Sequence, residues 1–229
     1  MKMISKIFAA TLCMFASMFS ATGKEGSPEV GFLRIINAIA PGNDTTRVLI
    51  DGEDLFAKGY QLGQRSGGIG LAAGPHTVTL QKNGVESGTT MIDLKSGETL
   101  SLIGFAEKIP ATDDDTPPRW KTKILKLKQS DPERGFRMTL LSVCDLDEVK
   151  VDAIIPGQKD ITIAHVKRLS TAVIDLGSTR SEAMVNVGGE IISTVSPDEP
   201  GNHVVVIYQD AEGKIRALTF FDPQFVIAG

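Results

Sequence analysis

The sequence predicts an all-β protein that follows a signal peptide and consists of two tandem antiparallel β-sandwiches, immunoglobulin-like or transthyretin-like. Three observations predict this class. Apolar residues occur in short runs with a period of two, tight-turn dipeptides separate the runs, and the same order of runs and turns occurs twice. The 229 residues are 41% hydrophobic and 23% charged, which favours a packed core over disorder.

The N-terminus has the pattern of a secretory signal over residues 1–23. Lys2 and Lys6 give a positive start, an apolar run covers Ile7 to Phe19, and Ala21-Thr22-Gly23 offers a small-residue cleavage site. The apolar run is shorter than the roughly 20 residues that cross a bilayer. We therefore expect export to the periplasm, the cell envelope or the medium, without a transmembrane segment in the mature chain. A retained anchor helix is the alternative.

Net charge and cysteine content narrow the functional classes. The formal net charge is −4, and removal of the signal would take away two of the 24 basic residues and no acidic one. An acidic chain is not typical of nucleic-acid binding, so we expect no nucleic-acid partner. Cleavage would also remove Cys13 and leave Cys144 alone, so no internal disulfide can form. Because Cys144 closes an apolar run, we expect it to act as a small buried hydrophobe.

The first half contains five predicted strands up to Phe105, separated by tight turns. In Pro75 to Leu80 the period of two places Val78 and Leu80 on one face. Asn83-Gly84 predicts a hairpin with a primed turn, which requires positive φ at both residues. The best helical candidate is a single turn near Glu53 to Lys58. The other predicted strands are Phe32 to Ala40, Arg47 to Asp51, Met91 to Leu94 and Leu100 to Phe105.

The second half repeats the pattern of the first. Gly135 to Val143 matches Gly31 to Ile39, and Gly188-Gly189 corresponds to the Asn83-Gly84 turn. This similarity predicts an internal duplication, with general β-patterning as the alternative. We expect each half to end in a long hairpin. The expected pairs are Leu100 to Phe105 with Thr122 to Lys128, and Val204 to Tyr208 with Ile215 to Phe221.

These repeats predict one sandwich domain at residues 30–130 and a second at residues 134–229. The link between them, Ser130 to Arg134, is short and contains a proline. A short, stiff link restricts the mutual orientation of the domains that it joins.

Three segments of the first half resemble the bacterial domain family of unknown function DUF4397. They are Arg34 to Ala38 with the following Ala40-Pro41, Val48 to Gly52, and Leu71 to Val78. The resemblance covers Gly31 to Ala106 and implies an exported sandwich domain in a bacterial envelope, with no catalytic residues to transfer. The second half resembles the family only as a degenerate copy. It lacks the Gly-x-His segment, and the family's opening often has a histidine in place of Asn37.

Few residues are spaced for catalysis or for metal binding. His76, His165 and His203 are not at metal-ligand spacings, which predicts isolated strand and surface histidines and no cofactor. Carboxylate clusters attract calcium, and the better of two clusters comprises Asp145, Asp147 and Glu148. The weaker cluster lies at residues 113–115. A solvated acidic loop is the alternative interpretation of both.

The most distinctive segment is basic and follows the loop from Pro110 to Pro118. Its candidate binding residues are Arg119, Trp120, Lys121, Lys123, Lys126 and Lys128. A β-bulge at Ile124-Leu125 would place all four lysines on one face. One interpretation is an edge strand protected from aggregation by lysines. The other is a basic stripe that binds an anionic glycan, a lipid head group or an acidic protein partner.

The sequence therefore favours a non-enzymatic exported protein of the cell envelope or surface, which acts as a binding or structural module. The alternative is a hydrolase with an unrecognised site, supported only by scattered acidic residues and histidines.

Overall fold

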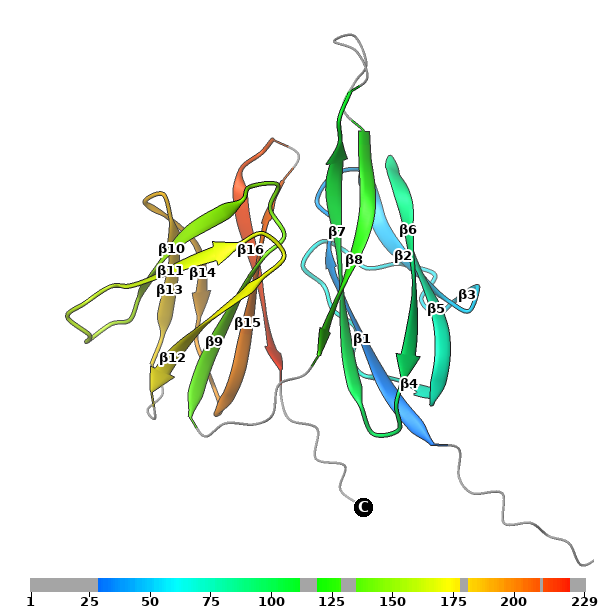
Figure 1. Cartoon of the computed structure of the whole chain (residues 1–229), viewed down its shortest axis with the longest axis horizontal. Helices are drawn as coiled ribbons and strands as arrows, with labels where there is room; N and C mark the ends of the chain where they lie inside the picture. The colour runs from blue at the N-terminus through cyan, green and yellow to red at the C-terminus, as the bar shows by residue number, and fades with distance from the viewer. Residues whose placement is uncertain (1–28, 112–118, 129–134, 178–180, 211, 223–229) are drawn as a thin grey trace, which may run out of the picture.

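The computed structural model of the chain describes residues 29–111, 119–128, 135–177, 181–210 and 212–222 (Figure 1). All regular secondary structure in these residues is β-strand, which confirms the predicted all-β class. The expected signal peptide at 1–23, the link from Ser130 to Arg134 and the acidic cluster at 113–115 lie outside these residues. Within them, no helix is long and apolar enough to span a membrane.

The first half of the chain forms a sheet of eight strands in the order β3-β2-β5-β6-β8-β7-β1-β4. Only one bridge, between Glu86 and Lys121, joins β6 to β8, so this sheet folds over at that point into two layers. The strands are β1 (Val30–Ala38), β2 (Asn43–Ile50), β3 (Glu53–Asp54), β4 (Ile69–Ala72), β5 (Gly74–Asn83), β6 (Val85–Leu94), β7 (Thr99–Ile109) and β8 (Arg119–Lys128).

The second half forms two sheets of four strands, in the orders β11-β10-β13-β14 and β12-β9-β15-β16. The strands are β9 (Phe136–Ser142), β10 (Glu148–Ile154), β11 (Thr162–Lys167), β12 (Thr171–Gly177), β13 (Ala183–Val187), β14 (Glu190–Val195), β15 (Gly201–Gln209) and β16 (Ile215–Asp222).

The two halves have the same strand order. The layer β4-β1-β7-β8 corresponds to β12-β9-β15-β16, and the layer β3-β2-β5-β6 corresponds to β11-β10-β13-β14. The correspondence extends to register, because Phe32 begins the β1–β7 ladder and Phe136 begins the β9–β15 ladder. Both of these ladders are parallel. Each half therefore combines the expected antiparallel pairs with a parallel ladder that the sequence did not predict.

The predicted hairpins form. Leu100 to Phe105 pairs with Lys123 to Lys128, and Val204 to Tyr208 pairs with Arg216 to Phe220. A primed turn with positive φ at both residues occurs at Gly188-Gly189. At Asn83-Gly84 only the glycine has positive φ, because a register shift in the β5–β6 ladder provides the geometry instead. The helical turn expected near Glu53 to Lys58 is wrong, since β3 begins there.

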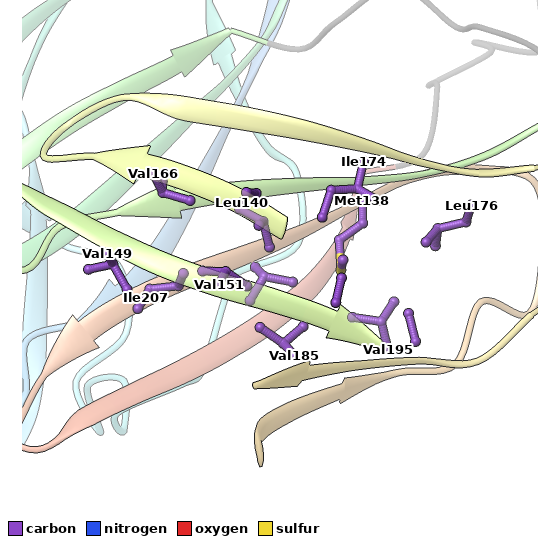
Figure 2. Packing of buried hydrophobic residues seen from close by; sticks show 14 of the residues in the cluster. Met138, Leu140, Val149, Val151, Val166, Ile174, Leu176, Val185, Val195 and Ile207 are labelled. Carbon is purple, nitrogen blue, oxygen red and sulfur yellow. The ribbon is translucent and has the colours of Figure 1, made fainter. Parts of the chain in front are cut away.

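Each half has its own hydrophobic core. In the first half, side chains of β2, β5 and β6 pack against those of β1 and β7, with Leu33, Ile35 and Leu102 fully buried. In the second half, β10 and β13 pack against β9 and β15 (Figure 2). Met138 and Val151 are fully buried there.

A third hydrophobic cluster joins the two halves and buries the second face of each inner sheet. Figure 1 shows the ribbons of the two halves side by side. On β1, for example, Ile35 packs in the core of the first half, whereas the next residue, Ile36, packs against the second half. The molecule is thus a stack of four β-layers with three apolar interfaces. The cluster contains Ile36, Ala38, Ile103, Phe105, Leu141, Val143, Val204, Val206, Tyr208, Leu218 and Phe220.

A buried ion pair also connects the halves. The guanidinium of Arg34 on β1 lies 2.7 Å from the carboxylate of Asp222 on β16, and their side chains are 2% and 6% exposed. Charged side chains are rarely buried unless they are paired. This contact therefore fixes the position of the last described strand against the first.

Gly88 permits the close approach of β6 to β8. A Cβ atom at this position would lie 2.5 Å from the carbonyl oxygen of Thr122. We expect Gly88→Ala to lower the free energy of unfolding by about 1–3 kcal/mol, because the backbone must shift. Gly67→Ala is the matched control: a Cβ there would meet no heavy atom within 4 Å, and a change within about 0.5 kcal/mol is expected. Equal urea-denaturation midpoints for the two variants would contradict this assignment.

Candidate functional site

The predicted basic segment forms β8, and its pairing with β7 continues without a register shift from Arg119 to Lys128. The expected bulge at Ile124-Leu125 is therefore absent, and the lysines do not share one face. Trp120 and Ile124 pack against the core of the first half, whereas Leu125 and Leu127 pack against the cluster between the halves. Because the ladder is continuous, side chains alternate between the two faces of β8, so the lysines are divided between the faces. Both faces also carry apolar side chains.

The basic side chains of β8 have acceptors nearby. Lys121 lies 2.7 Å from Glu86, and Arg119 lies 3.9 Å from the same carboxylate. Lys126 donates a hydrogen bond of 2.6 Å to the carbonyl of Met91. The hydrogen bond from Lys121 lowers the pKa of Glu86, which stays ionised. The structure places the backbone of Lys128 in the strand and describes nothing of its side chain.

The edge-strand interpretation of β8 also needs correction. The strand lies between β7 and β6, although its link to β6 is the single bridge at Lys121. Lys123 faces Glu107 at 3.3 Å, and Arg168 from the second half hydrogen-bonds the same carboxylate. This hydrogen bond lowers the pKa of Glu107. Lys121 and Lys123 are thus part of local ion pairs, and the carboxylate that pairs with Lys123 also binds Arg168 of the second half.

The three acidic residues proposed for calcium do not converge. The carboxylate of Asp145 lies 3.5 Å from Arg168, and that of Glu148 lies 2.7 Å from the Nδ1 atom of His165. Asp147 accepts a hydrogen bond from the backbone of Arg168 through its carbonyl. Among the residues that the structure describes, no group of three such ligands could hold a metal ion.

A cleft between the two halves brings together Trp120 and Asp145, one residue from each predicted site. The cleft has a volume of about 320 Å³. The first half contributes the end of β7 and the start of β8, and the second half contributes the segment after β9 and the β15–β16 hairpin. The lining residues are Phe105, Ala106, Lys108, Trp120, Val143, Asp145, Tyr208, Gln209, Asp210, Glu212 and Gly213.

The cleft forms where the apolar interface between the halves ends. Phe105, Val143 and Tyr208 belong to the hydrophobic cluster and also line the cleft. Trp120 is half-buried and lies opposite Lys108 in the β7–β8 ladder. Burial raises the pKa of Tyr208, so its hydroxyl stays protonated at neutral pH. The inner wall is therefore apolar and aromatic, and the rim carries charges of both signs.

Several polar groups of the rim already form hydrogen bonds within the protein. Asp210 accepts hydrogen bonds from Arg216 and from the backbone of Glu212 and Lys214. The amide of Gln209 accepts from the backbone of Asp145 and donates to the carbonyl of Gly213. These contacts fix the β15–β16 turn, so the cleft is preformed on this side.

A second pocket of about 440 Å³ contains His203. The ring of His203 packs against that of Phe221 in a tilted arrangement, with 4.9 Å between centroids. Its buried Nε2 atom has no hydrogen-bond partner among the described residues. Burial lowers the pKa of His203, so the ring is neutral at neutral pH. Arg65 from the first half also lines this pocket, but Trp120 and the acidic residues predicted from sequence do not.

Cys144 is buried, as predicted, in the core of the second half with 1% of its surface exposed. Burial raises the pKa of its thiol to about 11. The thiolate is the nucleophilic form of cysteine, so this side chain is suited to packing rather than to nucleophilic attack.

Two histidines have carboxylate partners that sequence spacing did not reveal. His165 pairs with Glu148, and His76 lies 2.7 Å from Asp51 through Nδ1. The Nε2 atom of His76 lies 2.8 Å from the carbonyl oxygen of Ala72. Both partners of this ring are acceptors, so only the doubly protonated imidazolium can donate to both. The hydrogen bonds to Ala72 and Asp51 raise the pKa of His76 above 6.5.

We expect these contacts of His76 to stabilise the protein most at mildly acidic pH. A raised pKa means that the stabilisation is complete below 6.5 and is lost as the pH rises through the folded-state value. The hydrogen bond from His76 also lowers the pKa of Asp51. The stabilisation that comes from the ionised Asp51 is therefore complete above pH 3.8 and is lost as the pH falls through the lower folded-state value. The destabilisation caused by His76→Gln, measured by urea denaturation, should therefore be larger at pH 5.5 than at pH 9. A difference that grows with pH would contradict this assignment.

The fold and this site together define a class: an all-β protein of four stacked layers with a preformed aromatic cleft between two similar halves. Comparison of the chain with protein-family models and with curated proteins found no match. The resemblance of residues 31–106 to the DUF4397 family therefore stays a prediction.

Sequence reasoning found Trp120 and Asp145 but missed the rest of the cleft. Phe105 and Tyr208 occur in ordinary strand patterns, and their meeting depends on how the halves pack. The sequence does contain one sign of this packing. The apolar runs in β1, β9 and β15 are uninterrupted, whereas a strand with one buried face would alternate apolar and polar residues.

Proposed function

We propose that this protein is a non-enzymatic, exported module of the cell envelope or surface that binds a ligand or partner in the cleft between its two halves. The observation that supports this most directly is the lining of the cleft by Trp120, Phe105 and Tyr208. Concave sites with apolar walls and a few polar groups are typical of ligand binding. The protonated, buried thiol of Cys144 agrees with a non-enzymatic role.

The proposal of export rests on the sequence pattern of residues 1–23. Its test is the mature N-terminus of the protein isolated from a bacterial host that expresses the full chain. Export predicts a chain that begins near residue 24 and is recovered in the periplasm or the medium. A full-length chain retained in the cytoplasm would contradict it.

The binding proposal can be tested by fluorescence, because Trp120 is the only tryptophan of the chain. A ligand in the cleft should change its emission in a saturable way. We expect at least one class among neutral, anionic and cationic oligosaccharides or peptides to do so. If no class in this panel changes the emission or gives a heat of binding by calorimetry, the proposed binding function is wrong.

A further inference from the structure

The free polar groups of the cleft indicate the chemistry of its ligand. Among the described residues, no hydrogen bond or ion pair is made by the Lys108 ammonium, the Glu212 carboxylate or the Trp120 indole N–H. The Tyr208 hydroxyl likewise has no hydrogen bond there. These four groups are therefore available to a ligand, unlike those of Asp210 and Gln209.

The free charges of the cleft balance. Lys108 and Glu212 carry opposite charges and are both exposed. The other two charged groups of the lining are already paired, Asp145 with Arg168 at 3.5 Å and Asp210 with Arg216 at 3.0 Å. An anionic ligand that pairs with Lys108 would face Glu212 and Asp145, and a cationic ligand would face Lys108. The cleft therefore does not select strongly for either sign.

The basic residues of β8 do not change this balance. Lys121 and Arg119 pair with Glu86, and Lys123 pairs with Glu107. None of these three lines the cleft. The basic residues of β8 therefore do not set the charge of the cleft.

From this lining we propose that the cleft binds an uncharged saccharide segment of a glycan, an inference that rests on the proposed binding function. A sugar hydroxyl both donates and accepts hydrogen bonds. It can therefore satisfy Lys108 and Trp120, which only donate, as well as Glu212, which only accepts. The apolar face of the sugar ring packs against the aromatic wall. The volume of about 320 Å³ fits a short segment rather than a long chain.

The experiment titrates the full chain, after any processing, with three probes: neutral hexose oligosaccharides, oligogalacturonates and chitosan oligosaccharides. We expect neutral probes to change Trp120 emission saturably. Their apparent Kd should change less than about twofold between about 50 and 500 mM NaCl, because no net charge is paired.

Two variants at exposed positions test the assigned contacts without disturbing the core. Lys108→Met and Glu212→Gln should each weaken binding of the neutral probe by about fivefold to tenfold, since each removes one hydrogen bond to a charged group. Lys167→Met and Glu53→Gln, which are exposed and outside the cleft, are matched controls and should leave the affinity unchanged. Thermal unfolding of each variant verifies the fold.

The outcomes separate this inference from the proposed function. If only a charged probe binds, and its affinity falls steeply with salt, the saccharide inference is wrong while the binding function stands. If neutral probes bind but Lys108→Met and Glu212→Gln match the controls, the assigned site is wrong. If none of the three saccharide probes binds but a peptide changes Trp120 emission, the saccharide inference is wrong while the binding function stands. If neither saccharides nor peptides bind, the proposed binding function fails together with the inference.

Discussion

Replacement of Arg34 by methionine should lower the free energy of unfolding by about 3–5 kcal/mol. The substitution leaves the carboxylate of Asp222 buried, because the side chain of Asp222 is only 6% exposed and its guanidinium partner lies 2.7 Å away. A buried charge without a partner is far more costly than the ion pair is stabilising. Chemical denaturation followed by circular dichroism measures the change.

Two controls isolate the effect of burial. Arg47→Met removes the exposed ion pair with Asp54 and should cost at most about 1 kcal/mol. The double variant Arg34→Met, Asp222→Leu removes both charges and should recover most of the lost stability. A cost for Arg34→Met as small as that of Arg47→Met would show that the two halves do not bury this contact.

Phe105→Ala should lower the free energy of unfolding by about 3–5 kcal/mol through a cavity at the interface of the halves. Phe105 is 4% exposed and packs in the hydrophobic cluster that both halves share. Since the cavity lies between the two inner sheets, the loss tests their packing directly. Thermal and urea unfolding both report it.

The control for this prediction is Ile191→Ala. Ile191 is an apolar residue of β14 that is 53% exposed, and its truncation should change stability by about 0.5 kcal/mol or less. If Phe105→Ala costs no more than this control, the halves do not pack as the structure shows. Crystallisation of the variant would then reveal their arrangement.

The sequence predicted the strands and hairpins well because these depend on local patterns. Val78 and Leu80 share a buried face, and the Leu100–Lys128 hairpin pairs as expected. The parallel pairing of β1 with β7 was missed, because no local pattern specifies which distant strands become neighbours. Packing between the halves was missed for the same reason, although the short link suggested a restricted orientation.

The site could be predicted only in part. The long loop before Trp120 predicts a site at this residue, and the structure places Trp120 in the cleft. The lysines do not share one face because β8 pairs with β7 without a bulge, and Glu86 comes close to Lys121 only through the fold. Likewise, Asp51 and Ala72 come close to His76 only through strand pairing and turns.

The parallel ladders have a consequence for how the chain acquires its fold. During synthesis from the N-terminus, the first sandwich cannot be completed until β7 has been made and pairs with β1. The second sandwich likewise cannot be completed until β15 pairs with β9. Long-range pairing of this kind is slow, with folding times of milliseconds to seconds. Before this pairing, β1 and β9 expose apolar side chains to solvent. We therefore expect a chaperone that binds unfolded chains to bind at these two strands.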